Sequence, residues 1–214
     1  MTALHTSQSQ APDDMGLELT LIVAATTKMG IGFKGGLPWK GLKKEMAYFR
    51  RVTLGGGESQ NTVIMGRKTW DSIPPKFRPL KGRRNVVISR SLSPSSTPAS
   101  TTPETADGPI ILQSLPDAIE FLRNTQKNEK VSGKVFIIGG AQIYKSALEM
   151  KEAKRVLLTR VQGDFECDTY FPEMGEGWSK KSGEELRGWT GEGEEVEEEI
   201  EEGGVRYRFE MWER

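Results

Sequence analysis

Short runs of consecutive apolar residues, separated by stretches with helical periodicity, are the feature that most constrains this fold. Five runs are typical of buried strands: 19–25, 62–66, 85–89, 135–138 and 155–161. Helical patterns occupy three of the intervals between them, at 42–53, 115–125 and 141–149. Because strands covered on both faces read as continuous apolar runs, the alternation predicts an α/β fold with a mainly parallel sheet between layers of helices.

The C-terminal part has a different pattern. Two runs, 194–202 and 205–213, flank Gly203-Gly204, which predicts a β-hairpin with a primed turn. In the second run apolar and polar residues alternate, as in a half-buried strand. The acidic residues of the first run are interpreted as a solvated strand face rather than a tail that binds a partner.

Length and composition favour one domain. The chain has 214 residues, and 36% of them are apolar, which suits one modest core. The segment 91–108, rich in Ser, Thr and Pro, is either a domain linker or a flexible surface insertion. We favour an insertion because neither flank has enough apolar residues for a separate core. We therefore expect a disordered tail at 1–16 and one domain at 17–214.

Several classes of site are excluded by composition. The single histidine, His5, lies in the polar N-terminal segment, and Cys167 is the single cysteine. A Ser-His-Asp or Cys-His nucleophile site, or a zinc site of Cys and His, therefore lacks its residues. The 30 basic and 30 acidic residues give no overall field for nucleic acid or membranes. With no possible intramolecular disulfide, no membrane-length apolar run and no export signal, we expect a cytoplasmic protein.

A glycine-rich segment imitates a dinucleotide-binding motif. Residues 30–35 match G-x-G-x-x-G and follow a predicted strand. The motif works only when its last glycine opens a helix, but Gly36-Leu37-Pro38-Trp39 follows instead. We therefore favour a mobile flap with apolar tips at Ile31 and Leu37 over a Rossmann site.

Three other strand ends carry groups that suit phosphate oxygens. They are Met65-Gly66-Arg67-Lys68-Thr69, Ile138-Gly139-Gly140-Ala141-Gln142 and Ser89-Arg90. The first two combine glycines with the N–H groups of a helix start, and the third suits a phosphate monoester. Each alone could be an ordinary turn. Because the carboxyl ends of parallel strands share one edge, together they indicate a dinucleotide with an extra phosphate, NADPH rather than NADH.

One carboxylate lies on an apolar helical stripe. Leu42, Met46, Phe49 and Val52 form the stripe, and Glu45 falls within it. A carboxylate there loses hydration unless it finds a partner. One interpretation is a salt bridge to a nearby lysine or arginine. The other is a binding group that accepts two parallel hydrogen bonds from a 2-amino-4-oxo-pteridine, with Phe49 against the ring.

These motifs together resemble dihydrofolate reductase. The matching segments, in family order and spacing, are 31–32, 37–39, Glu45 with Tyr48-Phe49, 63–70, 72–74, 78–83, 89–90, 138–140, 164–166 and 168–169. The resemblance runs from about residue 19 to the C-terminus, is interrupted by the Ser/Thr/Pro segment, and points to the eukaryotic, fungal-like branch. It implies a single domain with a central eight-stranded, mostly parallel sheet, a C-terminal antiparallel hairpin and about four flanking helices.

The resemblance also implies a reaction. NADPH would reduce 7,8-dihydrofolate to tetrahydrofolate by hydride transfer to C6, with a proton added at N5. Glu45 would hold the pterin, Thr159 would support its carboxylate, Trp39 would order a water, and Leu37 would close over the reacting carbons. Water rather than Glu45 would be the immediate proton donor. Other residues implied in substrate binding are Val23, Met46, Phe49, Ile73, Phe77, Leu80, Arg83, Ile138 and Tyr144.

Within that set, Arg83 would bind the α-carboxylate of the substrate's glutamate tail, and several apolar members could equally be plain core. The cofactor-binding residues implied by the resemblance are Ala24, Ile31, Gly32, Gly66, Arg67, Lys68, Thr69, Ser89, Arg90, Ile138, Gly139, Gly140, Ala141, Gln142, Ile143 and Tyr144. Cis peptides are expected at Gly139-Gly140 and Arg78-Pro79. Antifolate-type inhibitors are expected ligands. A monomer is expected, with no metal and no required protein partner.

Two alternatives stay open. One is a reductase of the same fold that acts on a ribosyl-aminopyrimidine, which should lack the pair Trp39 and Glu45. The other is a catalytically idle relative that binds NADPH or RNA. The presence of Leu37, Trp39, Glu45 and Arg83 argues against both.

Overall fold

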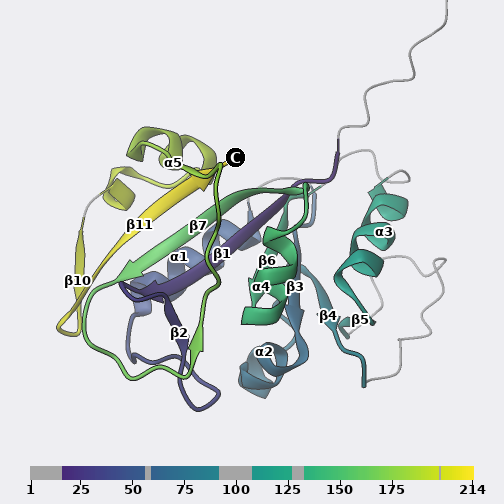
Figure 1. Ribbon diagram of the computed structural model, residues 1–214, viewed down its shortest axis with the longest axis horizontal. Helices are drawn as coiled ribbons and strands as arrows, with labels where there is room; N and C mark the ends of the chain where they lie inside the picture. The colour runs from purple at the N-terminus through teal and green to yellow at the C-terminus, as the bar shows by residue number, and fades with distance from the viewer. Residues whose placement is uncertain (1–15, 56–58, 92–107, 127–132, 198) are drawn as a thin grey trace, which may run out of the picture.

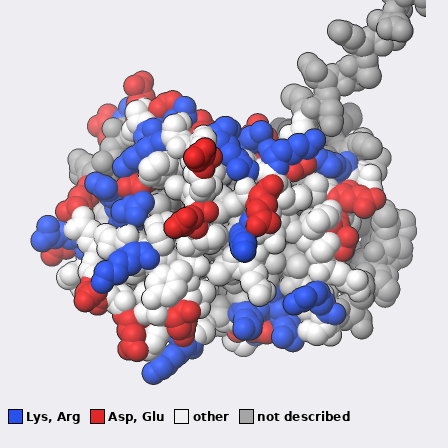
Figure 2. All heavy atoms as spheres, viewed as in Figure 1, with Lys and Arg blue, Asp and Glu red and all other residues white. Residues whose placement is uncertain are grey.

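The computed structural model describes residues 16–55, 59–91, 108–126, 133–197 and 199–214 (Figure 1). The expected tail at 1–16 and the expected insertion at 91–108 fall almost entirely outside the described residues and stay predictions. In the described part, no helix is both long and apolar enough to cross a membrane. Figure 2 shows acidic and basic side chains interspersed over the face viewed, as the equal counts of the two charges suggest.

One mixed sheet forms the centre of the molecule. Eight strands follow the order β10-β11-β7-β1-β6-β3-β4-β5, and β9 pairs with β11 beside this path. The strands are β1 Leu19–Thr26, β3 Thr62–Gly66, β4 Arg84–Ile88, β5 Ile110–Leu112, β6 Val135–Gly139, β7 Ala153–Val161, β9 Ser179–Lys180, β10 Ile200–Glu202 and β11 Val205–Glu213. Pairing from β7 to β5 is parallel, and only the strands of the C-terminal hairpin and β9 pair antiparallel. A separate two-stranded sheet joins β2 Gly30–Gly32 to β8 Thr169–Tyr170.

Helices cover both faces of the sheet, so the central strands β1, β3, β4 and β6 are almost entirely buried. The helices are α1 Lys43–Leu54, α2 Arg67–Ser72, α3 Leu115–Gln126, α4 Ala141–Leu148 and α5 Gly183–Thr190, with 3-10 turns η1 Pro75–Phe77 and η2 Glu194–Glu197. Side chains of α3 and α4 pack with Leu19, Leu21 and Val23 of β1 in one core. Side chains of α1 and α5 pack with Ile22 in the other core. In Figure 1, α4 lies in front of the sheet and α1 lies behind it. The alternation along β1 therefore builds two apolar layers, as the sequence predicts.

The predicted fold class is confirmed, with one correction in the C-terminal hairpin. The described residues form five α-helices where about four are expected, and α5 is the one for which the sequence gives no prediction. Its start nevertheless carries a capping box, in which Ser182 and Glu185 bond each other's backbone N–H. The first arm of the hairpin is also shorter than 194–202: residues 194–197 form η2, since Val196 turns into the core, and only Ile200–Glu202 is a strand. The turn itself is confirmed, with φ of 61° at Gly203 and 77° at Gly204.

Gly133, which precedes β6, packs closely against the backbone of Gln60 and Asn61, and a substitution there tests this packing. A Cβ atom at this position would lie 2.2 Å from the carbonyl oxygen of Gln60 and 2.9 Å from the backbone nitrogen of Asn61. Because both neighbours are backbone atoms, we expect Gly133→Ala to lower the free energy of unfolding by about 2–3 kcal/mol. Urea denaturation measures the change.

The matched control is Gly188→Ala in α5, where an added Cβ meets nothing within 4 Å. This change is expected to raise stability by about 0.5–1 kcal/mol, since alanine favours a helix. Equal stabilities of the two variants would contradict the close packing of residues 60–61 against Gly133.

Candidate active site

Glu45 is a buried carboxylate without a cationic partner. Its side chain, on α1, is only 6% exposed, and Thr159 Oγ1 of β7 donates a hydrogen bond of 3.2 Å to its Oε1. No lysine or arginine of the described chain forms an ion pair with it, so the salt-bridge interpretation is not what the structure shows. Burial raises the pKa of Glu45 from 4.5 to about 7; the Thr159 hydrogen bond lowers it and the charge of Glu202 raises it further.

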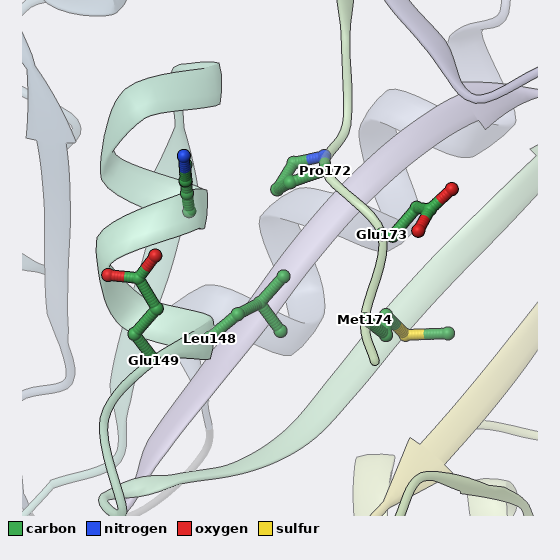
Figure 3. Close-up of a pocket in the computed structure, with 6 residues that line it drawn as sticks. Leu148, Glu149, Pro172, Glu173 and Met174 are labelled. Atoms are coloured by element: carbon green, nitrogen blue, oxygen red, sulfur yellow. The ribbon is translucent and has the colours of Figure 1, made fainter. Parts of the chain in front are cut away.

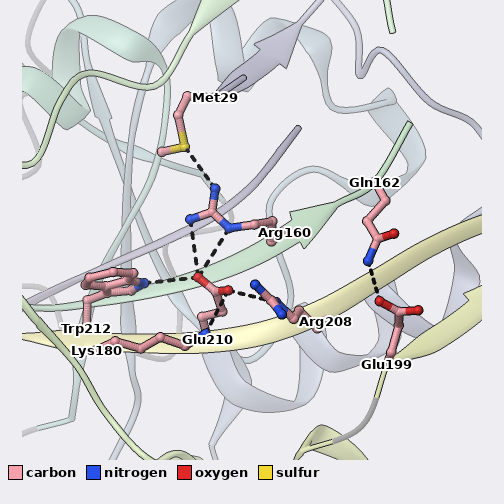
Figure 4. A network of polar contacts seen from close by, with 8 residues as sticks. All are labelled: Met29, Arg160, Gln162, Lys180, Glu199, Arg208, Glu210 and Trp212. Atoms are coloured by element: carbon pink, nitrogen blue, oxygen red, sulfur yellow. Dashed lines mark hydrogen bonds and ion pairs between the residues drawn. The ribbon is translucent and has the colours of Figure 1, made fainter. Parts of the chain in front are cut away.

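A second buried carboxylate provides the contrast. Glu210 on β11 is 3% exposed, but it pairs with Arg160, Lys180 and Arg208 and accepts a hydrogen bond from Trp212 Nε1 (Figure 4). Burial alone would raise its pKa, but the bonds from Lys180 and Arg160 hold the pKa of Glu210 below its usual value. Glu210 is thus satisfied within the protein, whereas Glu45 keeps unused hydrogen-bond capacity.

The buried face of α1 differs from the apolar stripe seen in the sequence. The helix buries Glu45, Tyr48 and Val52, while Met46 is 52% exposed and Phe49 is half-buried. Tyr48 stacks on Phe209 of β11 with ring centroids 3.9 Å apart, and this contact fixes the buried face. Of the apolar stripe, Leu42 and Val52 are therefore buried, whereas Met46 lies on the exposed side of α1.

The sheet divides next to Glu45. Strands β1 and β6 pair only as far as Leu21 and Ile137, while β1 continues to pair with β7 up to Thr26. Along that longer ladder, Ala24 lies opposite Thr159. The carboxyl ends of two neighbouring parallel strands therefore part, which is where ligands enter open α/β sheets.

Several candidate residues lie at this division. Val23 and Ala24 are on β1 beyond the last β1–β6 pair, and Ile138 is at the corresponding place on β6. Tyr144 of α4 is 3% exposed, and its hydroxyl donates to the carbonyl of Ile22 at 2.8 Å. Burial, and then the charge of Glu45, raise the pKa of Tyr144, so the two groups share one electrostatic environment.

The three predicted phosphate segments lie along one edge. They follow β6, β3 and β4, which are consecutive neighbours in the sheet and parallel. Neither Gly66, at the start of α2, nor Gly140, at the start of α4, provides a side-chain cap, so these helix starts keep free N–H donors. Ser89 is buried, and the three cations of these segments, Arg67, Lys68 and Arg90, are exposed.

Glycine fits closely where these segments meet. A Cβ at Gly139 or Gly140 would lie 3.2 or 3.3 Å from Thr69 Oγ1, and one at Gly66 would lie 3.2 Å from Ile143 Cγ1. A side chain at these positions would therefore crowd Thr69 or Ile143, and the φ of 132° at Gly139 also favours glycine. The expected cis peptides at Gly139-Gly140 and Arg78-Pro79 are both present.

The glycine-rich segment is not a Rossmann turn. Strand β2 pairs with β8, and the backbone N–H of Lys34 donates to Asp168 Oδ2 at 2.7 Å. Between residues 16 and 42, all of which the structure describes, no helix begins, which agrees with the predicted extended loop. Of the two expected apolar tips, Leu37 is 51% exposed, whereas Ile31 packs against the core.

Arg83 is a second buried charge with spare capacity. It is 8% exposed, and it donates to Thr53 Oγ1 at 2.8 Å and to the carbonyl of Lys81 at 3.3 Å. Burial, and then the charge of Arg50, lower the pKa of Arg83. Within the described chain no carboxylate pairs with Arg83, so the guanidinium can still bind an anionic group. The sequence does not predict that Thr53 holds Arg83. The one indication is that Thr53 lies one helical turn after Phe49.

Exposed apolar side chains favour a ligand surface. Four large hydrophobic side chains of the described residues stand out as exposed: Leu37, Met46, Phe77 and Tyr170. Three of the four are among the sequence-derived site candidates. Phe49, Ile73 and Leu80 are half-buried against the α1-side core. Trp39 is 4% exposed, and its Nε1 finds no acceptor in the described part of the chain.

A hollow elsewhere contains none of these candidates. It has a volume of about 290 Å³ and is lined by Lys145, Leu148, Glu149, Pro172, Glu173 and Met174, between α4 and the segment after β8 (Figure 3). Its lining combines charged and apolar side chains and indicates no particular ligand or reaction. Among the described residues no group of three or more His, Cys, Asp or Glu side chains could hold a metal ion.

Comparison with known proteins identifies the family. The family model described as dihydrofolate reductase matches residues 18–209. The dihydrofolate reductase of Pneumocystis carinii is 43% identical, covering 92% of this chain and 96% of that protein. The enzyme of Cryptococcus neoformans is 40% identical over 97% of both chains, and that of Mus musculus is 39% identical over 92% of this chain and 97% of that one. The chain therefore belongs to the dihydrofolate reductase family, and it is an oxidoreductase.

Proposed function

We propose that the protein uses NADPH to reduce 7,8-dihydrofolate to 5,6,7,8-tetrahydrofolate. The observation that carries this proposal is Glu45, a buried carboxylate with no cation beside it, next to the point where β1 and β6 part. Such a group costs stability in the free protein, so its free acceptor oxygens favour a ligand that donates to them.

The pterin ring supplies two parallel donors, an amino group and a ring N–H. Glu45 accepts both, while Thr159 holds the carboxylate from the opposite side. The buried Nε1 of Trp39 orders a water, through which a proton reaches N5 of the substrate. With a pKa of about 7, Glu45 can be protonated near neutral pH and so raise the supply of protons to that water.

The rest of the substrate meets apolar side chains and one arginine. Phe49, Ile73 and Leu80 offer partly exposed apolar surface for the benzoyl ring, with Met46 and Phe77 beyond them. The guanidinium of Arg83 binds the α-carboxylate of the glutamate tail in place of water. Leu37 closes over the reacting carbons and excludes solvent. Antifolate-type inhibitors would use the same contacts.

The residues at the sheet edge fit NADPH. When bound, the cofactor supplies a hydride from its nicotinamide C4 to C6 of the substrate. Ala24, Ile31 and Gly32 hold the nicotinamide, beside Tyr144 and Ile138. The N–H groups at the starts of α2 and α4 bind the pyrophosphate together with Lys68 and Thr69. The 2′-phosphate is bound by Arg67, Ser89 and Arg90.

This assignment predicts the cofactor selectivity. We expect Arg90→Ala to weaken NADPH binding about tenfold or more, since it removes a charge-assisted hydrogen bond, and to leave NADH binding nearly unchanged. Quenching of tryptophan fluorescence measures both dissociation constants. Arg206→Ala is the control, because Arg206 is an exposed arginine on the distant hairpin, 60% exposed in its side chain. Equal losses for the two cofactors would remove Arg90 from the 2′-phosphate site.

A direct assay tests the proposed function. Purified protein is mixed with NADPH and dihydrofolate, and the loss of absorbance at the nicotinamide band is followed. Turnover with dihydrofolate supports the proposal, whereas no turnover, or turnover with a ribosyl-aminopyrimidine alone, rejects it. The product would enter the one-carbon reactions that make thymidylate and purines, in the cytoplasm, with the protein acting as a monomer.

A further inference from the structure

Helix α1 begins without a cap of its own. Leu42, at its N-cap position, supplies no side-chain hydrogen bond. The carboxylate of Glu202, at the end of β10, accepts from the backbone N–H of Lys43 at 2.9 Å and from that of Lys44 at 2.9 Å. A side chain from the far end of the chain therefore bonds two N–H groups of the helix start. The N–H of Lys43 is shared with the carbonyl of Gly41 at 2.9 Å, whereas that of Lys44 depends on Glu202.

The same carboxylate is tied to the central sheet. The hydroxyl of Tyr207, on β11, donates to Glu202 Oε2 at 3.2 Å, and the Tyr207 side chain is fully buried. Two residues further along β11, Phe209 lies opposite Thr159 of β7. Glu202 therefore joins the start of the helix that carries Glu45 to the strands that carry the Thr159 hydroxyl.

We propose that Glu202 is a positioning residue for Glu45: its carboxylate fixes the start of α1 at Lys43 and Lys44, next to Glu45 in the chain, and places a like charge there. The inference rests on the proposed function of Glu45. A like charge disfavours the ionised form of a neighbouring acid, in agreement with the contribution of Glu202 to the raised pKa of Glu45. Glu202 thereby helps to keep Glu45 protonated near neutral pH, when the reaction needs a proton.

Other groups that face Glu45 do not replace this charge. Thr159 from β7 donates a hydrogen bond, which favours the ionised form. The phenols of Tyr48, Tyr144 and Tyr207, from α1, α4 and β11, interact with the Glu45 charge, but burial raises the pKa of each, so they stay neutral. Glu202 is thus the acidic neighbour whose charge acts on Glu45.

The experiment compares Glu202→Gln with wild type. Reduction consumes a proton, so turnover falls as pH rises through the pKa that governs it. We expect Glu202→Gln to move the midpoint of this fall lower by about half a pH unit, and to cut turnover at pH 8 about threefold. KM for NADPH is expected to stay unchanged. Titration of the Glu45 carboxyl by ¹³C NMR, without ligands, is expected to show the same downward shift.

The control is Glu201→Gln, which makes the same charge change at a residue whose side chain is 67% exposed and lies beside Arg206. Glu202→Asp keeps the charge and is expected to retain a midpoint close to that of wild type, so it serves if the glutamine variant does not fold. An unshifted midpoint and NMR titration in Glu202→Gln, or equal shifts in Glu201→Gln, would overturn the inference. Failure of the proposed function looks different: wild type itself would not oxidise NADPH with dihydrofolate, whatever the NMR titration shows.

Discussion

Replacing Glu45 with glutamine is expected to slow the reduction of dihydrofolate roughly a thousand-fold, a loss of about 4 kcal/mol in the transition state. Glutamine keeps the size of the side chain, but it has one acceptor oxygen and presents an NH₂ group to a donor of the pterin. One donor of the substrate is then left unpaired in a buried site, which costs free energy beyond the lost bond. The protonation equilibrium of Glu45 is removed as well. Binding of NADPH is expected to change by less than about twofold, because Glu45 lies on α1, which is not among the segments proposed to bind the phosphates of the cofactor.

Steady-state turnover with saturating NADPH measures the first effect, and fluorescence titration measures the second. Glu184→Gln is the matched control, since Glu184 is exposed on α5 and should tolerate the change. Wild-type turnover in Glu45→Gln would mean that another group holds the pterin. A large loss of NADPH binding would instead show that the substitution disturbs the fold around α4.

The central strands could be predicted from the sequence because each is apolar on both faces. The run 62–66 matches β3, and 85–89 contains all of β4 but its first residue. The short strands were not predictable in this way. Strand β2 is two glycines and an isoleucine, and it forms only because β8 pairs with it from a distant part of the chain. For strands of this length tertiary pairing, rather than local pattern, decides the structure.

The candidate site was predictable where a residue conflicts with its surroundings. Glu45 could be identified because a charged side chain on an apolar stripe loses hydration, which is unfavourable unless it binds a partner. The exposure of Met46 was not predictable, because the rotation of α1 depends on Tyr48 stacking against Phe209, a contact between distant segments. Glu202 shows the same limit: in the sequence it is one acid in an acidic run, and only the fold brings it to the start of α1.

Burial of Glu45 is also expected to make the stability of the protein depend on pH. Burial raises the pKa of Glu45 from 4.5 to about 7 in the folded protein. Between these values the folded state keeps a proton that the unfolded state has lost, so rising pH favours unfolding. The stabilising contribution is complete below about pH 4.5 and is lost as pH rises through about 7. At 1.36 kcal/mol per pH unit, wild type should lose about 3 kcal/mol from this one group between pH 4 and pH 8.

Other carboxylates titrate over part of this range, so the effect is isolated by comparing wild type with Glu45→Gln in urea denaturation at each pH. The variant should gain about 3 kcal/mol relative to wild type from pH 4 to pH 8. Thr159→Val sharpens the test. It removes the hydrogen bond that lowers the pKa of Glu45. Glu45 should therefore ionise at a higher pH in this variant than in wild type, and the loss of stability should extend further into the alkaline range. A difference between wild type and Glu45→Gln that stays constant with pH would mean that Glu45 ionises in the folded protein as it does in water. The Glu45 carboxylate would then not be desolvated in the free protein. The proposal that a pterin binds to it would lose its basis, because that proposal depends on a buried carboxylate whose oxygens lack hydrogen-bond donors.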